Sequence, residues 1–402
     1  MLPAEKIGLR QVIADIGIVQ ITTGFMAFLF AATGPLAIIL SVGQQGGLSE
    51  AQLSSFVFGV FAINGILTIG MSWAYRMPIA LFWTIPGTVI IGPALKHLSY
   101  GELIGAFYVT SLVILVLGWS GFARRILKLI PMSIVMGMVA GLFLKFGLDV
   151  IRSLHQDFVL SASMIAVFFG LMAHARWAAV IPPLIGACVV GMVLVLARDV
   201  HLVQAGLSLS LIEPVLTRPE LSFHALVELV VPLVITILLI QNGQGEAVMA
   251  QSQHVAPLTP IAIACGVGGL LSAGVGAIGT ALTGPTTALI TSTGPRDRHY
   301  ATAIITACFA ILFGLYAPTF TQLMLSAPAA LILTSGGLAM SRALLNSFTM
   351  AFKGPFSFGA MVCFIVTVSD LSLLNIGAAF WGLVAGVAVS WLAERSDFSS
   401  VA

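Results

Sequence analysis

Two short segments interrupt long apolar stretches of the chain and could together form a binding site. They are Thr84-Ile85-Pro86-Gly87-Thr88 and Thr283-Gly284-Pro285-Thr286-Thr287. Because proline lacks a backbone donor and glycine lacks side-chain cover, each segment breaks a helix and exposes backbone polar groups. A helix that begins at such a break presents free N–H groups and the positive end of its dipole, which favour an anion. The pair of breaks therefore predicts a cavity for an anion.

The side chains at the breaks supply two kinds of contact. Phe82 and Trp83 precede the first break and offer aromatic faces, whereas threonine hydroxyls accompany both breaks. This mixture suits a flat aromatic ring that carries a carboxylate. The alternative is that both segments are proline kinks packed in a bundle, with each threonine bonded to its own helix.

More polar groups follow the apolar run Val230–Ile240, in the sequence Gln241-Asn242-Gly243-Gln244-Gly245-Glu246. Such groups are costly at membrane depth unless they have partners or a function. Glu246 could carry a coupled proton, or it could lie at the membrane boundary and only cap the helix. Gln20 and Thr23 lie on the matching first helix of the chain. The expected substrate-binding residues are Gln20, Thr23, Phe82, Trp83, Thr84, Gly87, Gln241, Asn242, Thr283, Gly284, Thr286 and Thr287.

The composition indicates an integral membrane protein. The 402 residues are 59% hydrophobic and 8% charged, with a mean hydropathy of +1.08, whereas soluble domains are roughly 25% charged. A net charge of +2 gives no sign of nucleic-acid binding. The four cysteines lie within apolar runs at spacings that suit neither a metal site nor a disulfide framework, so we expect no metal or cofactor.

The apolar stretches predict an all-α membrane protein with fourteen membrane segments, at about 20 residues per full crossing. Segments 3 and 10 are the broken ones, near 78–95 and 278–293. Full spans are expected near 18–42, 54–75, 101–121, 128–150, 158–174, 178–197, 226–248, 258–277, 300–324, 327–345, 355–371 and 375–393.

The polar stretch 199–224 divides the chain into two repeats, residues 1–198 and 225–402, of seven segments each. Asn64–Gly70 before the first break and Gly268–Gly274 before the second share a similar glycine pattern. An odd number of segments per half makes the two repeats inverted. Most of the seventeen Lys and Arg residues fall on one side of this arrangement, which places both termini in the cytoplasm.

The whole chain resembles a benzoate/proton symporter of the BenE type. The motifs that carry the resemblance are Gln241-Asn242-Gly243-Gln244-Gly245, Thr283-Gly284-Pro285-Thr286-Thr287 and Phe82-Trp83-Thr84-Ile85-Pro86-Gly87. More distantly, the arrangement is similar to the uracil transporter and to anion exchangers of the seven-plus-seven inverted-repeat fold. The resemblance implies a core domain, at about 11–121 and 225–325, that moves against a gate domain at about 125–198 and 326–395. It also implies short extended stretches in the broken segments, facing the substrate.

The sequence departs from the uracil-type carriers at their proton site. Those carriers have a Glu and a His on the eighth segment, where the nearest matches in this chain are Gln241 and Asn242 or the glycines that follow them. Their Glu on the tenth segment has an apolar counterpart near Ile290. The proton site cannot be carried over by position, so Glu246 is the candidate by elimination.

These observations predict a secondary transporter that imports benzoate or a related aromatic carboxylate across the bacterial inner membrane by proton symport. The expected partners are the substrate, protons and the lipid bilayer, with a homodimer possible. The alternatives are a carrier of the same fold for a nucleobase or an inorganic anion, or an anion channel. A membrane enzyme is not expected, because no nucleotide loop, metal cluster or nucleophile elbow occurs in a suitable setting.

Overall fold

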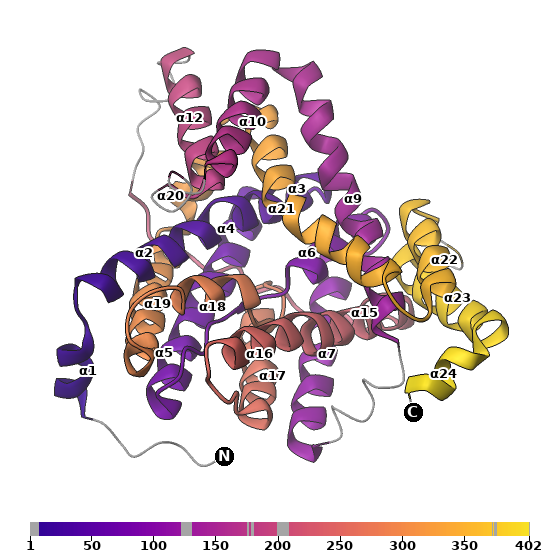
Figure 1. Cartoon of the computed structure of the whole chain (residues 1–402). Coiled ribbons are helices and arrows are strands. Elements are labelled where there is room, and N and C mark those ends of the chain that lie inside the picture. Colours follow the sequence, from indigo (N-terminus) through magenta and orange to yellow (C-terminus); the bar gives the residue numbers. More distant parts are fainter. Residues whose placement is uncertain are drawn as a thin grey trace.

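The computed structural model describes residues 8–121, 131–174, 177, 181–198, 209–371, 373 and 376–401. These residues form a bundle of helices (Figure 1), which encloses one buried two-stranded sheet. The elements up to residue 198 are α1 Leu9–Asp15, α2 Ile18–Ala32, α3 Gly34–Gln45, α4 Glu50–Phe58, η1 Gly59–Ile63, α5 Asn64–Tyr75, β1 Leu81–Trp83, α6 Ile85–Ala94, α7 Tyr100–Ser120, α9 Met132–Gln156, α10 Phe158–Ala173 and α12 Pro183–Arg198.

The later part of the chain repeats this order of helices around a second short strand. Its elements are α14 Phe223–Ala225, η2 Leu226–Val230, α15 Val231–Ile235, η3 Thr236–Gln241, α16 Asn242–Gln251, α17 Leu258–Gly274, β2 Thr280–Leu282, α18 Gly284–Ile290, η4 Arg296–Arg298, α19 His299–Leu315, α20 Ala317–Leu325, α21 Ala329–Phe352, α22 Ser357–Val368, α23 Ala378–Ala393 and α24 Arg395–Val401. The segments η1, η2 and η3 are π-helical turns within longer helices.

Six helices in the described residues are long and apolar enough to cross a membrane. They are Ile18–Gln45, Glu50–Tyr75, Tyr100–Ser120, Met132–Gln156, Phe223–Gln251 and Arg296–Leu315. Helices α20 and α21 pass the same test together, with a bend of 109° between them. The other apolar helices are shorter, so the count of fourteen crossings stays a prediction, although a helix lies at each of the expected positions.

Two expected spans contain an internal break, although the first of them, within Ile18–Gln45, still has the length and composition of a crossing. The stretch expected as 18–42 is broken at Thr33, between α2 and α3, and the stretch expected as 300–324 is broken at Tyr316, between α19 and α20. Proline follows closely at both breaks, as Pro35 and Pro318, within the first turn of the new helix. A proline there cannot bond back to the preceding turn, which ends the earlier helix.

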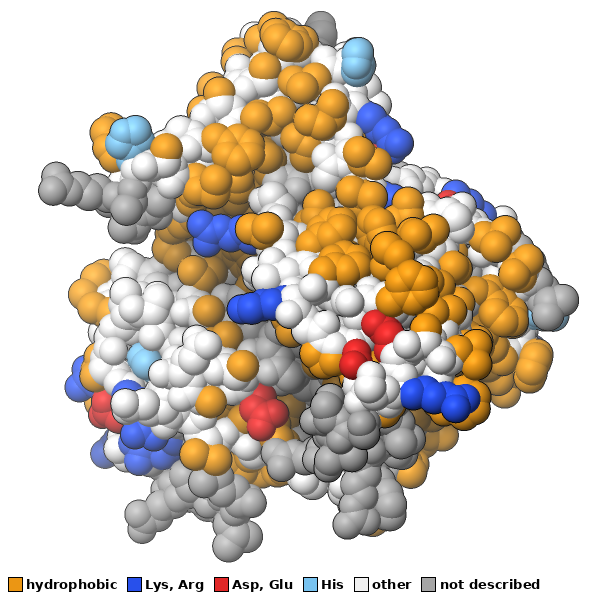
Figure 2. Space-filling view, turned by 45° about the vertical axis from the view of Figure 1, so that its right-hand side comes forward, with side chains coloured by type: hydrophobic (Ala, Val, Ile, Leu, Met, Phe, Trp, Pro, Cys, Tyr) orange, Lys and Arg blue, Asp and Glu red, His pale blue; other side chains and the backbone are white. Residues whose placement is uncertain are grey.

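The helices pack in two groups. In the first group, α7 lies along α17, and α19 lies along α2 and α5 (Figure 1). In the second group, α9 lies along α21, α22 packs on α9 and α23, and α10 packs on α12. The pairing of α7 with α17 is matched by that of α5 with α19, as two repeats of one plan would give. Wide hydrophobic areas with few charged side chains cover the face shown in Figure 2.

Residues 209–222 belong to the stretch expected as a linker and form no helix or strand. Hydrogen bonds hold them against the first group of helices. The backbone N–H of Ile212 donates to the Leu315 carbonyl at 2.9 Å, and that of Glu220 donates to the Gly101 carbonyl at 2.9 Å. Residues 199–208 of the expected linker lie outside the described residues. The described part therefore lies against α7 and α19 of the first group.

Candidate functional site

The two breaks meet at the centre of the molecule through the sheet. β1 and β2 pair antiparallel, with Phe82 opposite Ala281 and Trp83 opposite Thr280. The half-helices α6 and α18 begin directly after the strands, so both of their N-termini lie beside the sheet. The extended stretches expected in the broken segments are thus present.

A polar stripe on α5 holds β1 in place. Asn64, Thr68 and Ser72 are four residues apart and therefore share one helix face. The Asn64 amide donates to the Phe82 carbonyl at 3.0 Å, and the Thr68 hydroxyl bonds both the carbonyl and the N–H of Leu81 at 2.9 Å. These side chains replace the missing neighbouring strand and satisfy backbone groups that would otherwise be unpaired in a buried place.

Asn242 performs the matching task for β2. Its Oδ1 accepts a hydrogen bond from the Leu282 N–H at 2.8 Å, and the Thr280 hydroxyl donates to Asn64 Oδ1 at 2.6 Å. Asn242 was predicted to bind substrate, yet in this structure it holds the strand that precedes α18. Its predicted contact with the substrate stays a prediction.

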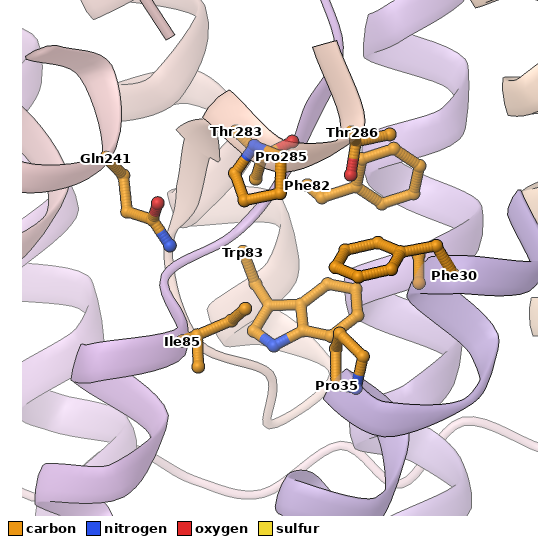
Figure 3. A pocket seen from close by; sticks show the side chains of 10 residues that line it. Phe30, Pro35, Phe82, Trp83, Ile85, Gln241, Thr283, Pro285 and Thr286 are labelled. Carbon is orange, nitrogen blue, oxygen red and sulfur yellow. The ribbon is translucent and has the colours of Figure 1, made fainter. Parts of the chain in front are cut away.

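A pocket of about 300 Å³, including its open mouth, lies between the sheet, the break after α2 and the end of η3 (Figure 3). It is lined by Phe30, Ala31, Pro35, Phe82, Trp83, Ile85, Gln241, Thr283, Pro285 and Thr286. Five of these residues were predicted from the sequence, namely Phe82, Trp83, Gln241, Thr283 and Thr286.

Aromatic rings form one wall of the pocket, and further aromatic rings outside the pocket pack against them. The indole of Trp83 lies 5.0 Å from the ring of Phe61, and Phe61 lies 4.8 Å from the ring of Phe313. Phe82 contacts both Phe61 and Trp83 edge to face. Because all of these rings are buried, the wall is rigid and its shape is set before any ligand enters.

The polar groups of the pocket are few and buried. Trp83 is 2% exposed, and its Nε1 has no hydrogen-bond partner among the described residues. Gln241 presents its amide and Thr286 its hydroxyl to the same pocket (Figure 3). A buried N–H without a partner costs free energy, so the indole N–H is ready to donate to an acceptor on a ligand.

The remaining residues of the two breaks shape the half-helices. The Thr84 hydroxyl caps α6 by accepting from the Gly87 N–H at 3.1 Å, while Thr287 donates to the Thr283 carbonyl. A Cβ on Gly87 would collide with Thr84 and Leu233, and one on Gly284 would press on Gln244. Bonding of threonine to its own helix was the alternative prediction, and it holds for Thr287, although Thr283 and Thr286 line the pocket.

Three predicted residues lie away from the lining. Gln20 caps the start of α2 by accepting from the Gly17 N–H at 3.0 Å. The Thr23 hydroxyl bonds the Thr293 hydroxyl at 2.6 Å, beyond the end of α18. Glu246 is half-buried on α16. Their predicted roles in binding and coupling stay predictions.

The sequence analysis missed Phe30, Ala31 and Pro35, which close the pocket opposite the sheet. A signal for them exists, because Thr33-Gly34-Pro35 repeats the Thr-Gly-Pro tripeptide of the second break. No three His, Cys, Asp or Glu side chains gather as metal ligands among the described residues.

Solved structures of anion transporters share this fold. The transmembrane domain of the cyanobacterial bicarbonate transporter BicA aligns with a TM-score of 0.58 and 15% identity, over 92% of this chain and 98% of that chain. The overall structure of SLC26A9 aligns with a TM-score of 0.64 and 11% identity, over 96% of this chain and 67% of that chain. The comparison therefore defines the fold as that of a helical membrane protein.

Sequence comparison defines the family. The family model of the benzoate membrane transport protein, BenE, matches residues 14–392, so the chain belongs to this family of membrane transport proteins. It is 30% identical to the inner membrane protein YdcO of Escherichia coli, over 93% of this chain and 97% of that protein. It is 25% identical to a benzoate membrane transport protein of Acinetobacter baylyi, over 90% of this chain and 92% of that protein.

Proposed function

We propose that the protein is a secondary active transporter that imports benzoate or a related aromatic carboxylate together with a proton. The observation that carries the proposal is the pocket at the two helix breaks, where a rigid aromatic wall faces a few polar groups. Membership of the benzoate transport family and the name of the Acinetobacter relative, a benzoate membrane transport protein, support the same substrate.

In the proposed binding mode, the ring of the substrate packs against Phe30, Phe82 and Trp83. Aromatic rings pack in offset or edge-to-face geometry, and the mutual angles of Phe61, Phe82 and Trp83 already follow this preference. The carboxylate accepts hydrogen bonds from the amide of Gln241, the hydroxyl of Thr286 and the N–H of Trp83. The positive end of α6 adds electrostatic stabilisation.

Proton coupling follows from the charge of the substrate. Moving one negative charge inward against an inside-negative potential costs about 2.3 kcal/mol per 100 mV. Entry together with one proton makes the step electroneutral and adds the pH gradient as a driving force. Glu246 is the proton-binding candidate from the sequence, and it lies outside the pocket lining.

The proposed transport cycle uses alternating access. Fourteen segments in two inverted repeats, 1–198 and 225–402, form a core domain at about 11–121 and 225–325 and a gate domain at about 125–198 and 326–395. The packing of α7 on α17 and of α9 on α21 supports this proposed division. The core moves against the gate, in a multi-pass protein of the bacterial inner membrane with both termini in the cytoplasm and two copies as a possible assembly.

The substrate can be tested by competition. We expect benzoate and small substituted benzoates to inhibit uptake of labelled benzoate into proteoliposomes, whereas uracil, bicarbonate and sulfate have little effect. The similarity to bicarbonate and other anion transporters concerns the fold, and an aromatic wall gives no advantage to a small inorganic anion. Strong uptake of uracil or bicarbonate with none of benzoate would favour the alternative carrier, and flux that never concentrates its substrate would favour a channel.

A further inference from the structure

A buried carboxylate lies where the two groups of helices meet, outside the lining of the pocket at the two breaks. Glu228 is 3% exposed and sits in the π-helical turn η2, at the start of the long helix that later reaches Gln241. Its Oε2 lies 2.8 Å from Nε2 of His97, which follows α6. An ionised carboxylate only accepts hydrogen bonds, so Nε2 carries the proton in this pair.

The same carboxylate reaches the second group of helices. The backbone N–H of Gly377, the N-cap of α23, hydrogen bonds to Glu228. A Cβ on Gly377 would lie 2.5 Å from Glu228 Oε1, so a larger residue at this position would displace the carboxylate. Glu228 therefore links α6 and η2 of the first group to the positive end of α23 in the second.

Other charges surround the link without bonding to Glu228. A second pocket of about 340 Å³ includes Glu228, Lys145, Asp370 and Gly377 in its lining. Lys145 pairs with Asp370 at 2.8 Å, and Lys96 pairs with the same carboxylate at 3.6 Å. Titratable groups also lie on the surrounding elements. They are His224 in α14, directly before η2, together with Lys96 and His97 after α6, Tyr100 and Glu102 on α7, Lys145 on α9 and Asp370 after α22.

We propose that Glu228 binds the coupled proton and that its ionised form holds the two groups of helices together. Separation of the groups would leave an ionised carboxylate without the Gly377 N–H in a buried place, which is costly. A proton taken up by the carboxylate forms an O–H bond, removes the charge and turns a charge-assisted hydrogen bond into a neutral one of about half the strength. The protonated protein can then open this contact.

The exposure of His97 gives the proton a route. Its side chain is 22% exposed, against 3% for Glu228, so the imidazole connects the buried carboxylate to water. In the proposed orientation this end of α6 faces the outside, where the proton enters during import. The inference rests on the proposed proton symport. It assigns the proton-binding site of that symport to Glu228 instead of Glu246.

The transport test compares three matched substitutions in proteoliposomes. We expect Glu228→Gln to lose proton-driven accumulation of benzoate at least tenfold while exchange of internal for external benzoate changes less than threefold. Glu50→Gln, an exposed carboxylate at the start of α4, serves as the control that keeps both activities. Accumulation that survives in Glu228→Gln but is lost in Glu246→Gln would overturn the proposal.

A second measurement needs no transport. In infrared difference spectra of the purified protein, acidification should produce the carbonyl stretch of a newly protonated buried carboxylic acid. We expect this band in the wild type and in Glu246→Gln, and not in Glu228→Gln. In His97→Gln the band should appear at higher pH, because the carboxylate loses a hydrogen-bond donor.

The two measurements separate the possible failures. If the wild type neither accumulates nor exchanges benzoate, the proposed function fails, and the infrared band still decides whether Glu228 takes up a proton. If the band is the same in Glu228→Gln and in the wild type, Glu228 is not the proton site, whatever the substrate. That result would overturn the inference and leave the benzoate pocket untouched.

Discussion

At the scale of single residues, Trp83 offers the clearest test of the pocket. Its indole N–H is buried without a partner, and a carboxylate that accepts from it would gain a charge-assisted hydrogen bond. We expect Trp83→Phe to raise the KM for benzoate about tenfold, which corresponds to about 1.4 kcal/mol. Uptake kinetics measure the change.

Trp119 provides the matched control for this substitution. Its side chain is 80% exposed on α7, away from the pocket lining, so Trp119→Phe should leave the KM unchanged. An unaltered KM in both variants would mean that the indole N–H does not contact the substrate.

The individual site residues were partly predictable from the sequence. The Pro-Gly breaks revealed Phe82, Trp83, Thr283 and Thr286 because helix-breaking residues are rare in such apolar runs. The sequence could not assign Asn242, since an amide that binds a ligand and one that binds a strand look alike until the neighbouring backbone is placed. Glu228 was missed because its partners His97 and Gly377 are distant in sequence.

At the scale of elements, the strand β1 depends on the polar stripe of α5. Thr68→Val keeps the shape of the side chain but removes both hydrogen bonds to Leu81. We expect a loss of about 1–3 kcal/mol in the free energy of unfolding, because buried backbone groups lose their partners. A lower melting temperature in detergent would show it. Thr22→Val, whose hydroxyl is exposed and bonds only its own helix, should change the melting temperature little.

The start of α6 gives a second prediction at this scale. A Cβ on Gly87 would collide with Thr84 and come within 2.9 Å of Leu233, so Gly87→Ala should shift the cap of α6 and the adjoining strand. We expect benzoate uptake to fall at least tenfold. Gly70→Ala is the control, because no atom lies within 4 Å of the added Cβ. Equal activity of the two variants would argue against a tight start of α6.

The elements themselves were largely predictable, because long apolar runs and helix breakers set their positions. Two breaks were missed, at Thr33 and Tyr316, where one proline divides what reads as a single apolar run. The role of Asn64, Thr68 and Ser72 was also out of reach. Their four-residue spacing is visible in the sequence, but it indicates only a shared helix face until β1 is seen beside it.

At the scale of the whole molecule, one buried histidine predicts a pH dependence of stability. Burial, together with the nearby His299 and Arg296, lowers the pKa of His254 from 6.5 to about 4. In the unfolded chain His254 takes up a proton near pH 6.5, whereas in the folded protein it stays neutral until about pH 4. Its contribution to stability is therefore complete above pH 6.5 and decreases as the pH falls towards 4.

We expect His254→Gln to have a smaller fall in melting temperature over this window than the wild type. His174, which is exposed, is the control, and His174→Gln should follow the wild type. A parallel fall in all three proteins would assign the pH dependence to other groups.

The whole molecule also shows where prediction from the sequence ends. Hydropathy predicts fourteen segments, while among the described residues six helices, or seven with the bent pair α20 and α21, reach the length and composition of a single crossing. Length alone does not decide how a short helix sits in a bilayer, because tilt and neighbours contribute. The packing of α9 on α21 and of α7 on α17 joins distant parts of the chain and follows from complementary surfaces, which one sequence does not reveal.

The most direct test of the central claim is uptake of labelled benzoate into proteoliposomes that contain the purified protein, with and without an inward proton gradient. We predict accumulation above the external concentration, beyond the leak of protein-free vesicles, that collapses when a protonophore is added. Uptake that only equilibrates, or that is indifferent to the proton gradient, would contradict proton symport. No protein-dependent uptake of benzoate would contradict the proposed substrate.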